Sequence, residues 1–316
     1  MRIAPAPLFQ DPVFEGPTDP TIIYNHMEKS WWILYTQRRA NVPSHGYGWV
    51  HGTDIGVASS KDNGQTWLYR GTLNIESIEP GRNTFWAPEV IWADGCFHMY
   101  VSYITGVPVA WVGDRNILHY TSDNLWDWKY QGTLELSSHR VIDACVYPTA
   151  EGWRMWYKDE DDQSHTHYAD SSDLFSWRHM GVATDDQSEE GPNVFKLGGK
   201  YWLIADIWHG IGVYYSDDLL HWKRQNGDIL STSGVRNDDA CLGHHADVIV
   251  QGEIAYIFYH VHPDEQLISG DPYSNYPRCR SCIQVAQLTV ENDRLTVIRD
   301  EPFDFYLPDD GAWKDG

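Results

Sequence analysis

Short apolar and aromatic runs recur along the whole chain, and turn-forming residues separate them. Runs rich in β-branched and aromatic residues are typical of strands, while Gly, Asn and Asp are typical of the turns between strands. No stretch sustains the helical period. The pattern predicts hairpins in which a buried strand is followed by an aromatic one. The five hairpins cover residues 20–24 with 31–35, 88–92 with 97–103, 141–147 with 153–157, 192–195 with 201–205, and 246–250 with 254–259.

A second motif, Ser-x-Asp/Asn-Leu-x-x-Trp, alternates with these hairpins. Its copies end at Trp128, Trp177 and Trp222. A copy one residue longer ends at Trp67 and fits the Asp-box pattern Ser-x-Asp-x-Gly-x-Thr-Trp, known from sialidase-type propellers. Asp and Asn side chains form turns by hydrogen bonding to nearby backbone. We expect each motif to be the turn of a second hairpin, with its tryptophan packed over that hairpin.

Two hairpins make a unit of four strands, and the unit recurs from Asp19 to about Ile298. Repetition of four-stranded units is typical of a β-propeller. We predict an all-β chain that folds as a five-bladed β-propeller with four antiparallel strands per blade, in a single domain over residues 1–316. The irregular segment 37–53 is expected to border the mouth of the central channel, and another loop covers residues 263–276.

The composition restricts which partners the protein can bind more than it restricts which fold the chain can adopt. Lys and Arg number 23 and Asp and Glu number 45, which gives a formal net charge of −22. This charge argues against nucleic acid and anionic membrane surfaces as partners, because a polyanion is repelled. The chain holds 16 tryptophans. Once-per-blade packing accounts for most of them and leaves a few as platforms for sugar rings. The oligomeric state is left open.

The N-terminal segment, with Pro5 and Pro7, does not resemble a signal peptide, and no apolar stretch reaches the roughly 18 residues of a membrane span. Five cysteines, an odd count, are expected to be reduced thiols of a cytoplasmic protein; a secreted protein that has lost its signal is the alternative. Cys279 and Cys282 form a Cys-x-x-Cys pair. A zinc site needs a second pair of ligands, so we interpret both as ordinary thiols.

The first strand of each propeller blade lines the central channel, so residues at the starts of these strands are expected to converge. Close like charges raise one another's pKa and bring no stability. Two carboxylates with separated pKa values are what glycoside hydrolysis requires. The residues at these positions are Asp19, Glu89, Asp143, Glu190 and the pair His244 and His245.

These positions resemble glycoside hydrolase family 43, of the five-bladed clan that includes arabinanases and β-xylosidases. The matching motifs are Asp19-Pro20, Trp86-Ala-Pro-Glu89 (Asp in the family), Ile142-Asp143, Glu190-Gly-Pro192 and Gly243-His244. The resemblance implies that Asp19 is the general base and Glu190 the general acid. Asp143 would keep the pKa of the acid raised. It also implies inversion at the anomeric carbon, with room for water between base and acid. Glu189 competes with Glu190, but the Gly-Pro register favours Glu190.

The resemblance further implies that His244 lies by a structural Ca²⁺ or Na⁺ at the axis, reached through water, and that the chemistry needs no cofactor. In the related anhydro-galactosidase family a histidine is the acid, which leaves His245 a possible direct role. Arg38 and Arg39 could bind an acidic substituent such as a uronate, although solvation or ion pairing is the commoner role. The candidate substrate contacts are Trp86, Glu89, Trp208, His209, His245 and Arg280.

The leading hypothesis is an inverting glycoside hydrolase that removes α-L-arabinofuranosyl or β-D-xylosyl units from plant-type oligosaccharides. One alternative is a hydrolase of the same clan for galactofuranose or anhydro-galactose. Another is a non-catalytic carbohydrate-binding propeller, which an intact set of acid, base and third carboxylate argues against. A phosphorylase needs a cationic phosphate site by the base, and the acidic axis argues against that.

Overall fold

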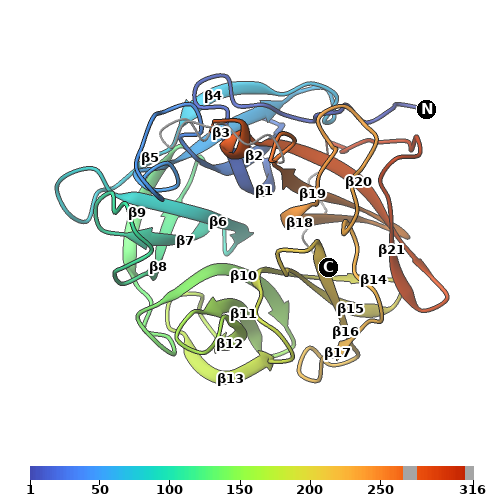
Figure 1. Cartoon of the computed structure of the whole chain (residues 1–316). Coiled ribbons are helices and arrows are strands. Elements are labelled where there is room, and N and C mark those ends of the chain that lie inside the picture. Colours follow the sequence, from blue (N-terminus) through green and yellow to red (C-terminus); the bar gives the residue numbers. More distant parts are fainter. Residues whose placement is uncertain (266–275, 310–316) are drawn as a thin grey trace.

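Five antiparallel sheets surround a common axis in the protein (Figure 1), whose structure is a computed structural model that describes residues 1–265 and 276–309. Each sheet is one blade, and its strands follow in chain order from the axis outward. Blade 1 holds β1 (Pro17–Asn25), β2 (Ser30–Gln37), β3 (Asp54–Ser60) and β4 (Leu68–Thr72). Blade 2 holds β6 (Thr84–Ala93), β7 (Cys96–Ile104), β8 (Asn116–Ser122) and β9 (Asp127–Thr133), and the short β5 (Asn74–Ile75) pairs in parallel with β9.

The other three blades repeat this order. Blade 3 holds β10 (Val141–Thr149), β11 (Gly152–Asp159), β12 (His165–Ser171) and β13 (Arg178–Thr184). Blade 4 holds β14 (Glu190–Leu197), β15 (Lys200–Asp206), β16 (Ile211–Ser216) and β17 (Lys223–Arg224). Blade 5 holds β18 (His244–Gln251), β19 (Ile254–Val261), β20 (Cys282–Glu291) and β21 (Arg294–Ile298). The described helix is the single turn α1 (Tyr276–Cys279). The predicted five-bladed β-propeller is confirmed.

The inner strands β1, β6, β10, β14 and β18 face the centre of the ring (Figure 1), and each is interrupted near its start by a shift in register. Bulges of this kind re-aim side chains, often beside functional sites. A positive φ is energetically unfavourable for a residue other than glycine. When it recurs at the same position of several blades, the surrounding structure must stabilise that backbone conformation. The bulge residues with positive φ are Asp19 (49°), Ala87 (44°), Asp143 (62°) and Gly191 (57°).

The outer hairpins of blades 2, 3 and 4 turn at the Ser-x-Asp/Asn-Leu-x-x-Trp motif, as the sequence predicts. In blade 2 the Ser122 hydroxyl accepts the Leu125 N–H (2.9 Å), and Trp128 Nε1 donates to the Leu125 carbonyl (3.0 Å). Leu125 has a φ of 64° yet is fully buried. Burial of the leucine side chain offsets the cost of this backbone conformation. The equivalent leucines of blades 3 and 4 also have a positive φ, which is 66° for Leu174 and 63° for Leu219.

A ring of side chains just beyond the bulges joins neighbouring blades. Asp247 of β18 accepts the Ile22 N–H of β1 (2.7 Å) and the side-chain amide of Asn193 of β14 (2.9 Å). These two contacts connect blade 5 to blade 1 and blade 4 to blade 5. The contacts at two further junctions are Glu89 with the Val146 N–H (3.0 Å) and Cys145 Sγ with the Val194 N–H (3.2 Å).

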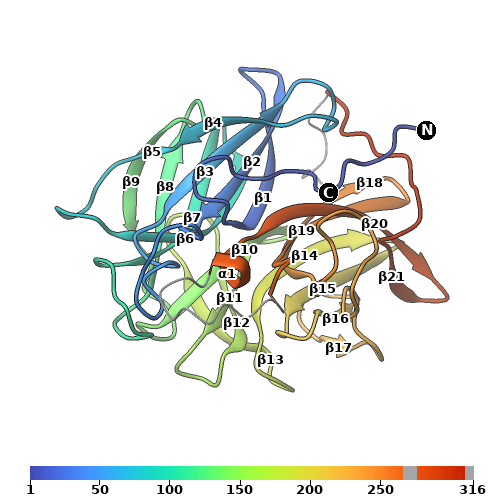
Figure 2. The same cartoon turned by 45° about the horizontal axis from the view of Figure 1, so that its top comes forward.

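The ends of the chain cross the junction between the first and last blades (Figure 2). The Leu8 and Phe9 N–H groups donate to the Ile283 carbonyl in β20 (2.9 and 3.1 Å), and the Leu307 N–H donates to the Asn63 carbonyl in blade 1 (3.0 Å). Every blade is built from one continuous segment, so terminal segments and axial side chains, rather than an exchanged strand, join blade 5 to blade 1.

Two further findings bear on the sequence predictions. All five cysteines are free thiols, and burial raises the pKa of the Cys279 thiol to about 11. In the part of the chain that the structure describes, no helix combines the length and the apolar character that a bilayer crossing needs.

Candidate active site

Three carboxyl groups meet at the end of the channel where the inner strands begin. Asp19 comes from β1, Asp143 from β10 and Glu190 from β14. Asp19 and Asp143 occupy bulges, and Glu190 immediately precedes the bulge residue of its strand. The Asp143 pKa responds to the charges of both other groups, which places the three in one electrostatic cluster.

Asp19 is held as a carboxylate. Its Oδ2 accepts the Thr18 hydroxyl (3.0 Å) and lies 3.3 Å from Arg38 Nη2. His245 Nδ1 lies 3.6 Å from Asp19 Oδ1. Burial favours the neutral acid, but the Arg38 and His245 charges and nearby hydroxyl groups outweigh it, so the Asp19 pKa is lowered.

Asp143 has the opposite electrostatic environment. Burial, aided by the negative charges of Glu190 and Asp19, raises its pKa to about 7 despite the opposing effects of His245 and Lys158. The Asp143 N–H donates to the Ser102 hydroxyl (3.0 Å), and the Gly191 N–H donates to Asp143 Oδ2 (3.2 Å). The Asp143 carboxyl therefore keeps its proton to a higher pH than Asp19 does.

Glu190 is paired with a buried lysine. Lys158 Nζ lies 3.0 Å from Glu190 Oε2, and Trp208 Nε1 donates to Glu190 Oε1 (3.1 Å). Burial favours the neutral acid, but the charge and hydrogen bond of Lys158 outweigh it, so the Glu190 pKa is lowered. The resemblance led us to expect a raised pKa on Glu190. In the structure the raised pKa belongs to Asp143, because Lys158 lies next to Glu190.

Glu189 points away from the three carboxyl groups of this site. It is fully buried, and it accepts hydrogen bonds from the hydroxyls of Thr166 (2.6 Å), Thr184 and Tyr214 (2.9 Å). Three hydroxyl donors satisfy its carboxylate inside the protein. This placement agrees with the choice of Glu190 on the Gly-Pro register.

His245 fills the space between the carboxyl groups. Burial lowers its pKa, but Asp143, Asp19 and Glu190 outweigh that effect and the net direction is upward. A Cβ on Gly191 would lie 2.6 Å from the His245 ring, so the glycine is required for this approach as well as for its φ of 57°.

His244 contacts Asp206, with Nδ1 3.0 Å from Asp206 Oδ2. Among residues 1–265 and 276–309, no group of three or more His, Cys, Asp or Glu side chains is arranged to hold a metal ion. Ca²⁺ prefers a shell of oxygen ligands, and the described carboxyl groups do not gather into a set of that kind around His244. An ion reached through water stays a prediction.

Two partly exposed tryptophans are connected to the carboxyl cluster, Trp208 directly and Trp111 through Glu160 and Lys158. Trp208, one of the predicted contacts, is 41% exposed and lies in the loop between β15 and β16 with the exposed His209 beside it. Trp86 is buried, and its ring stacks on Trp111 at 5.4 Å and 12°. Trp111 is 40% exposed, and its Nε1 donates to Glu160, which also contacts Lys158. The Trp111 ring also has the Arg115 guanidinium 4.8 Å from its centre, so Trp208 is the better placed of the two to contact a sugar ring.

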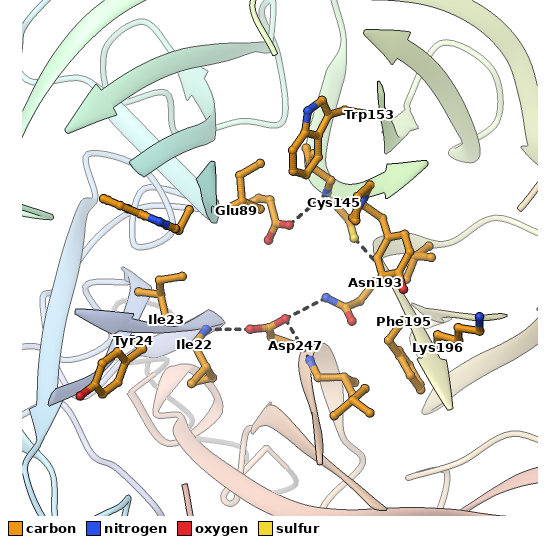
Figure 3. A pocket seen from close by; sticks show the side chains of 18 of the residues that line it. Ile22, Ile23, Tyr24, Glu89, Cys145, Trp153, Asn193, Phe195, Lys196 and Asp247 are labelled. Carbon is orange, nitrogen blue, oxygen red and sulfur yellow. Dashed lines mark hydrogen bonds between the residues drawn. The ribbon is translucent and has the colours of Figure 1, made fainter. Parts of the chain in front are cut away.

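Two predicted contacts lie elsewhere. Arg280 is paired with Asp238 (3.0 Å) and Asp264 (2.6 Å) and not with the carboxyl cluster. Glu89 lies beyond the bulge, where its carboxylate binds the Val146 N–H and lines a cavity of about 610 Å³ (Figure 3). In Figure 3, Asn193 and Asp247 lie across this cavity from Glu89, and Trp153 lies at its edge.

Lys158 and Trp111 are not among the residues predicted from the sequence. For Arg38 the sequence indicates solvation or ion pairing, or else a contact to an acidic sugar, without identifying Asp19 as its partner. Lys158 is the next-to-last residue of β11 and follows the aromatic pair Trp156 and Tyr157, and a charge at that point was the available signal. Trp111 lies outside every repeated motif, so its spacing carried no signal. The partner that each of these side chains finds is set by the approach of neighbouring blades.

No protein-family model and no curated protein matches the sequence. Solved structures do match the fold. A thermostable family-43 glycoside hydrolase is 19% identical at a TM-score of 0.65, over 94% of this chain and 99% of that one. A family-43 β-1,3-galactosidase with galactodeoxynojirimycin is 15% identical at 0.65, over 91% and 96%. A family-43 β-xylosidase/α-arabinofuranosidase from a compost microbial metagenome, in complex with xylotriose, is 17% identical at 0.62, over 94% and 97%. The chain thus has the five-bladed fold of these glycosidases.

Proposed function

We propose that the protein is an inverting glycoside hydrolase that acts on oligosaccharides. The observation that carries the proposal is the meeting of three carboxyl groups at one end of the channel with unlike neighbours, Arg38 beside Asp19 and Lys158 beside Glu190. Asp19 has a lowered pKa and Asp143 a pKa raised to about 7. Hydrolysis with inversion needs an ionised base and, at the same pH, a protonated carboxyl group that can supply the proton of the general acid.

In this proposal Asp19 takes a proton from the attacking water. Arg38 and Thr18 hold its carboxylate in place and ionised. Glu190 gives a proton to the leaving oxygen, and Trp208 orients it through Oε1. Asp143 holds the proton of the cluster in the free enzyme. Donors and acceptors fixed in advance reduce the reorganisation that the reaction requires.

For the sugar, we propose α-L-arabinofuranosyl or β-D-xylosyl units of plant-type oligosaccharides. The motif resemblance and the β-xylosidase/α-arabinofuranosidase of the same fold support pentosyl units. The alternative is a galactosyl substrate, which the galactosidase of the same fold supports. The partly exposed indole of Trp208, which donates a hydrogen bond to the acid, supports a sugar-binding site here.

A panel of aryl glycosides tests the reaction and the sugar together. We expect turnover on the β-xyloside or α-L-arabinofuranoside, and NMR of the first-formed sugar should show inversion. Asp19→Ala and Glu190→Ala should each lower kcat/KM by about 10²–10⁴-fold. A very good leaving group should rescue Glu190→Ala in part and Asp19→Ala not at all. Wild-type rates in both variants would exclude the assignment, and binding of oligosaccharides without turnover would favour the non-catalytic alternative.

A further inference from the structure

The inner strands have a second repeated feature besides their bulges. The last paired residue before each bulge faces an equivalent residue on the second strand of the same blade. Since the blades repeat one unit, side chains at these equivalent positions are expected to share a structural role. By register the five partners are Thr36, Ser102, Lys158, Asp206 and His260.

Four of the five side chains accept the backbone N–H of the bulge residue in the following blade. A buried N–H needs such an acceptor, which gives these positions a structural reason to be Thr, Ser, Asp or His. The pairs are Thr36 with Ala87 (2.8 Å), Ser102 with Asp143 (3.0 Å), Asp206 with His245 (3.1 Å), and His260 with Asp19 (3.4 Å).

Lys158 departs from this pattern. An ammonium group has three donors and no acceptor, so it cannot bind the N–H of Gly191, the next bulge residue. That N–H donates instead to Asp143 Oδ2 (3.2 Å). The propeller repeat therefore gives no structural reason for a lysine at this position, and an acceptor would serve the fold better.

The surroundings of Lys158 point to Glu190. Lys158 is 4% exposed, and burial of an ammonium group is costly unless it is paired. Its Nζ lies 3.0 Å from Glu190 Oε2, 3.6 Å from Glu160 Oε1 and 5.3 Å from the ring centre of Trp208. The closest of these groups is the carboxylate to which we assign the acid role.

We propose that Lys158 is a positioning residue that keeps Glu190 ionised in the free enzyme and so places the proton of the Glu190–Asp143 pair on Asp143. The inference rests on the proposed function, in which Glu190 protonates the leaving oxygen. In one cycle Asp143 passes its proton to Glu190, and Glu190 passes it to the leaving oxygen. The attacking water gives its hydroxyl to the anomeric carbon and its proton to Asp19. Asp19 then releases a proton to solvent, and Asp143 takes one up.

The sign of the pH effect follows from the charges. Lys158 lowers the pKa of both Asp143 and Glu190, so its removal lets the pair keep its proton to higher pH. An opposite charge at this distance moves a carboxyl pKa by about 1–3 units. The other titratable groups around the pair are Asp19 on β1, Asp206 on β15, His244 and His245 on β18, and Glu160 after β11.

The test is the pH profile of kcat/KM on an aryl glycoside that the wild type hydrolyses. In Lys158→Met we expect the alkaline limb to move up by about one pH unit or more. Lys158→Arg keeps the charge and should keep the limb in place. Lys129→Met, which removes an exposed lysine on β9, is the matched control and should reproduce the wild-type profile. Thermal unfolding of each variant reports any purely structural effect.

An alkaline limb in Lys158→Met that coincides with that of the wild type would overturn the inference, however much the rate falls. If Lys158→Met does not fold, Lys158→Gln provides the same comparison. Carboxyl ¹³C NMR of protein labelled at Asp and Glu follows the titration without turnover. An upward shift of the titration in the variant supports the inference, and an unchanged titration contradicts it. A wild-type protein that cleaves no glycoside counts against the proposed function alone.

Discussion

The state of Asp19 depends on a balance between burial, which favours the neutral acid, and the charges beside it. Arg38 is the main counterweight, with Nη2 3.3 Å from the carboxylate. Asp19 must be ionised to accept a proton from water. The Asp19–Arg38 ion pair therefore sets the pH below which the proposed base becomes protonated and can no longer accept a proton.

At the residue scale, replacing Arg38 tests this balance. Without the guanidinium, the Asp19 pKa rises and the base is protonated at a higher pH. We expect the acidic limb of kcat/KM in Arg38→Met to move up by about 1–3 pH units. Arg38→Lys, which keeps the charge, should show most of the wild-type profile. An acidic limb that stays in place in Arg38→Met would mean that Asp19 is not the base or that Arg38 does not control it.

At the scale of the element, the outer hairpins depend on a serine that precedes the turn. Ser171 Oγ accepts the N–H groups of Asp173 (3.2 Å) and Leu174 (2.9 Å). These bonds hold Leu174 at a φ of 66° with its side chain fully buried. The turn thus combines hydrogen bonds with a strained, buried leucine.

We expect Ser171→Ala to lower the free energy of unfolding by about 1–3 kcal/mol, because buried N–H groups lose their acceptor. Ser172→Ala is the matched control, since the neighbouring serine is exposed, and it should stay within about 0.5 kcal/mol of the wild type. Urea unfolding followed by tryptophan fluorescence measures both. Equal losses in the two variants would show that the Ser171 contacts do not stabilise the hairpin.

At the scale of the whole molecule, the ring must close between blade 5 and blade 1. Asp247 accepts the Ile22 N–H across this junction, as well as the Asn193 side chain and the Val248 N–H (2.9 Å). These contacts come from β1, β14 and β18, so one carboxylate connects three blades. Figure 3 shows it at the cavity, opposite Glu89.

We expect Asp247→Ala to cost more than about 3 kcal/mol of unfolding free energy, since each buried donor left without an acceptor costs about 1–3 kcal/mol. Hydrogen exchange should increase most in β1 and β18. Glu253→Ala, which alters an exposed carboxylate in the turn after β18, should change neither quantity. A small loss in Asp247→Ala would indicate that the terminal segments close the ring without it.

The repeat, and with it the five-bladed ring, can be predicted from the amino-acid sequence alone. Alternating hairpins and the Ser-x-Asp/Asn-Leu-x-x-Trp turns are local features, because their hydrogen bonds lie within a few residues. Asp19 and Asp143 occupy the bulge position of their units, and Glu190 stands one position before it. Their meeting at one end of the axis follows from the repeat, whereas Glu89, which was expected there too, lies beyond the bulge of its strand.

The pKa shifts and the side-chain partners depend on how neighbouring blades pack against one another. The lowered pKa of Glu190 depends on Lys158, which lies 32 positions away on another strand. Arg280 pairs with Asp238 and Asp264, and Glu89 binds the next blade beyond the bulge. A bulge of one residue changes which way each following side chain points, and neighbouring blades supply the charges. The spacing of residues along the chain does not predict these contacts between blades.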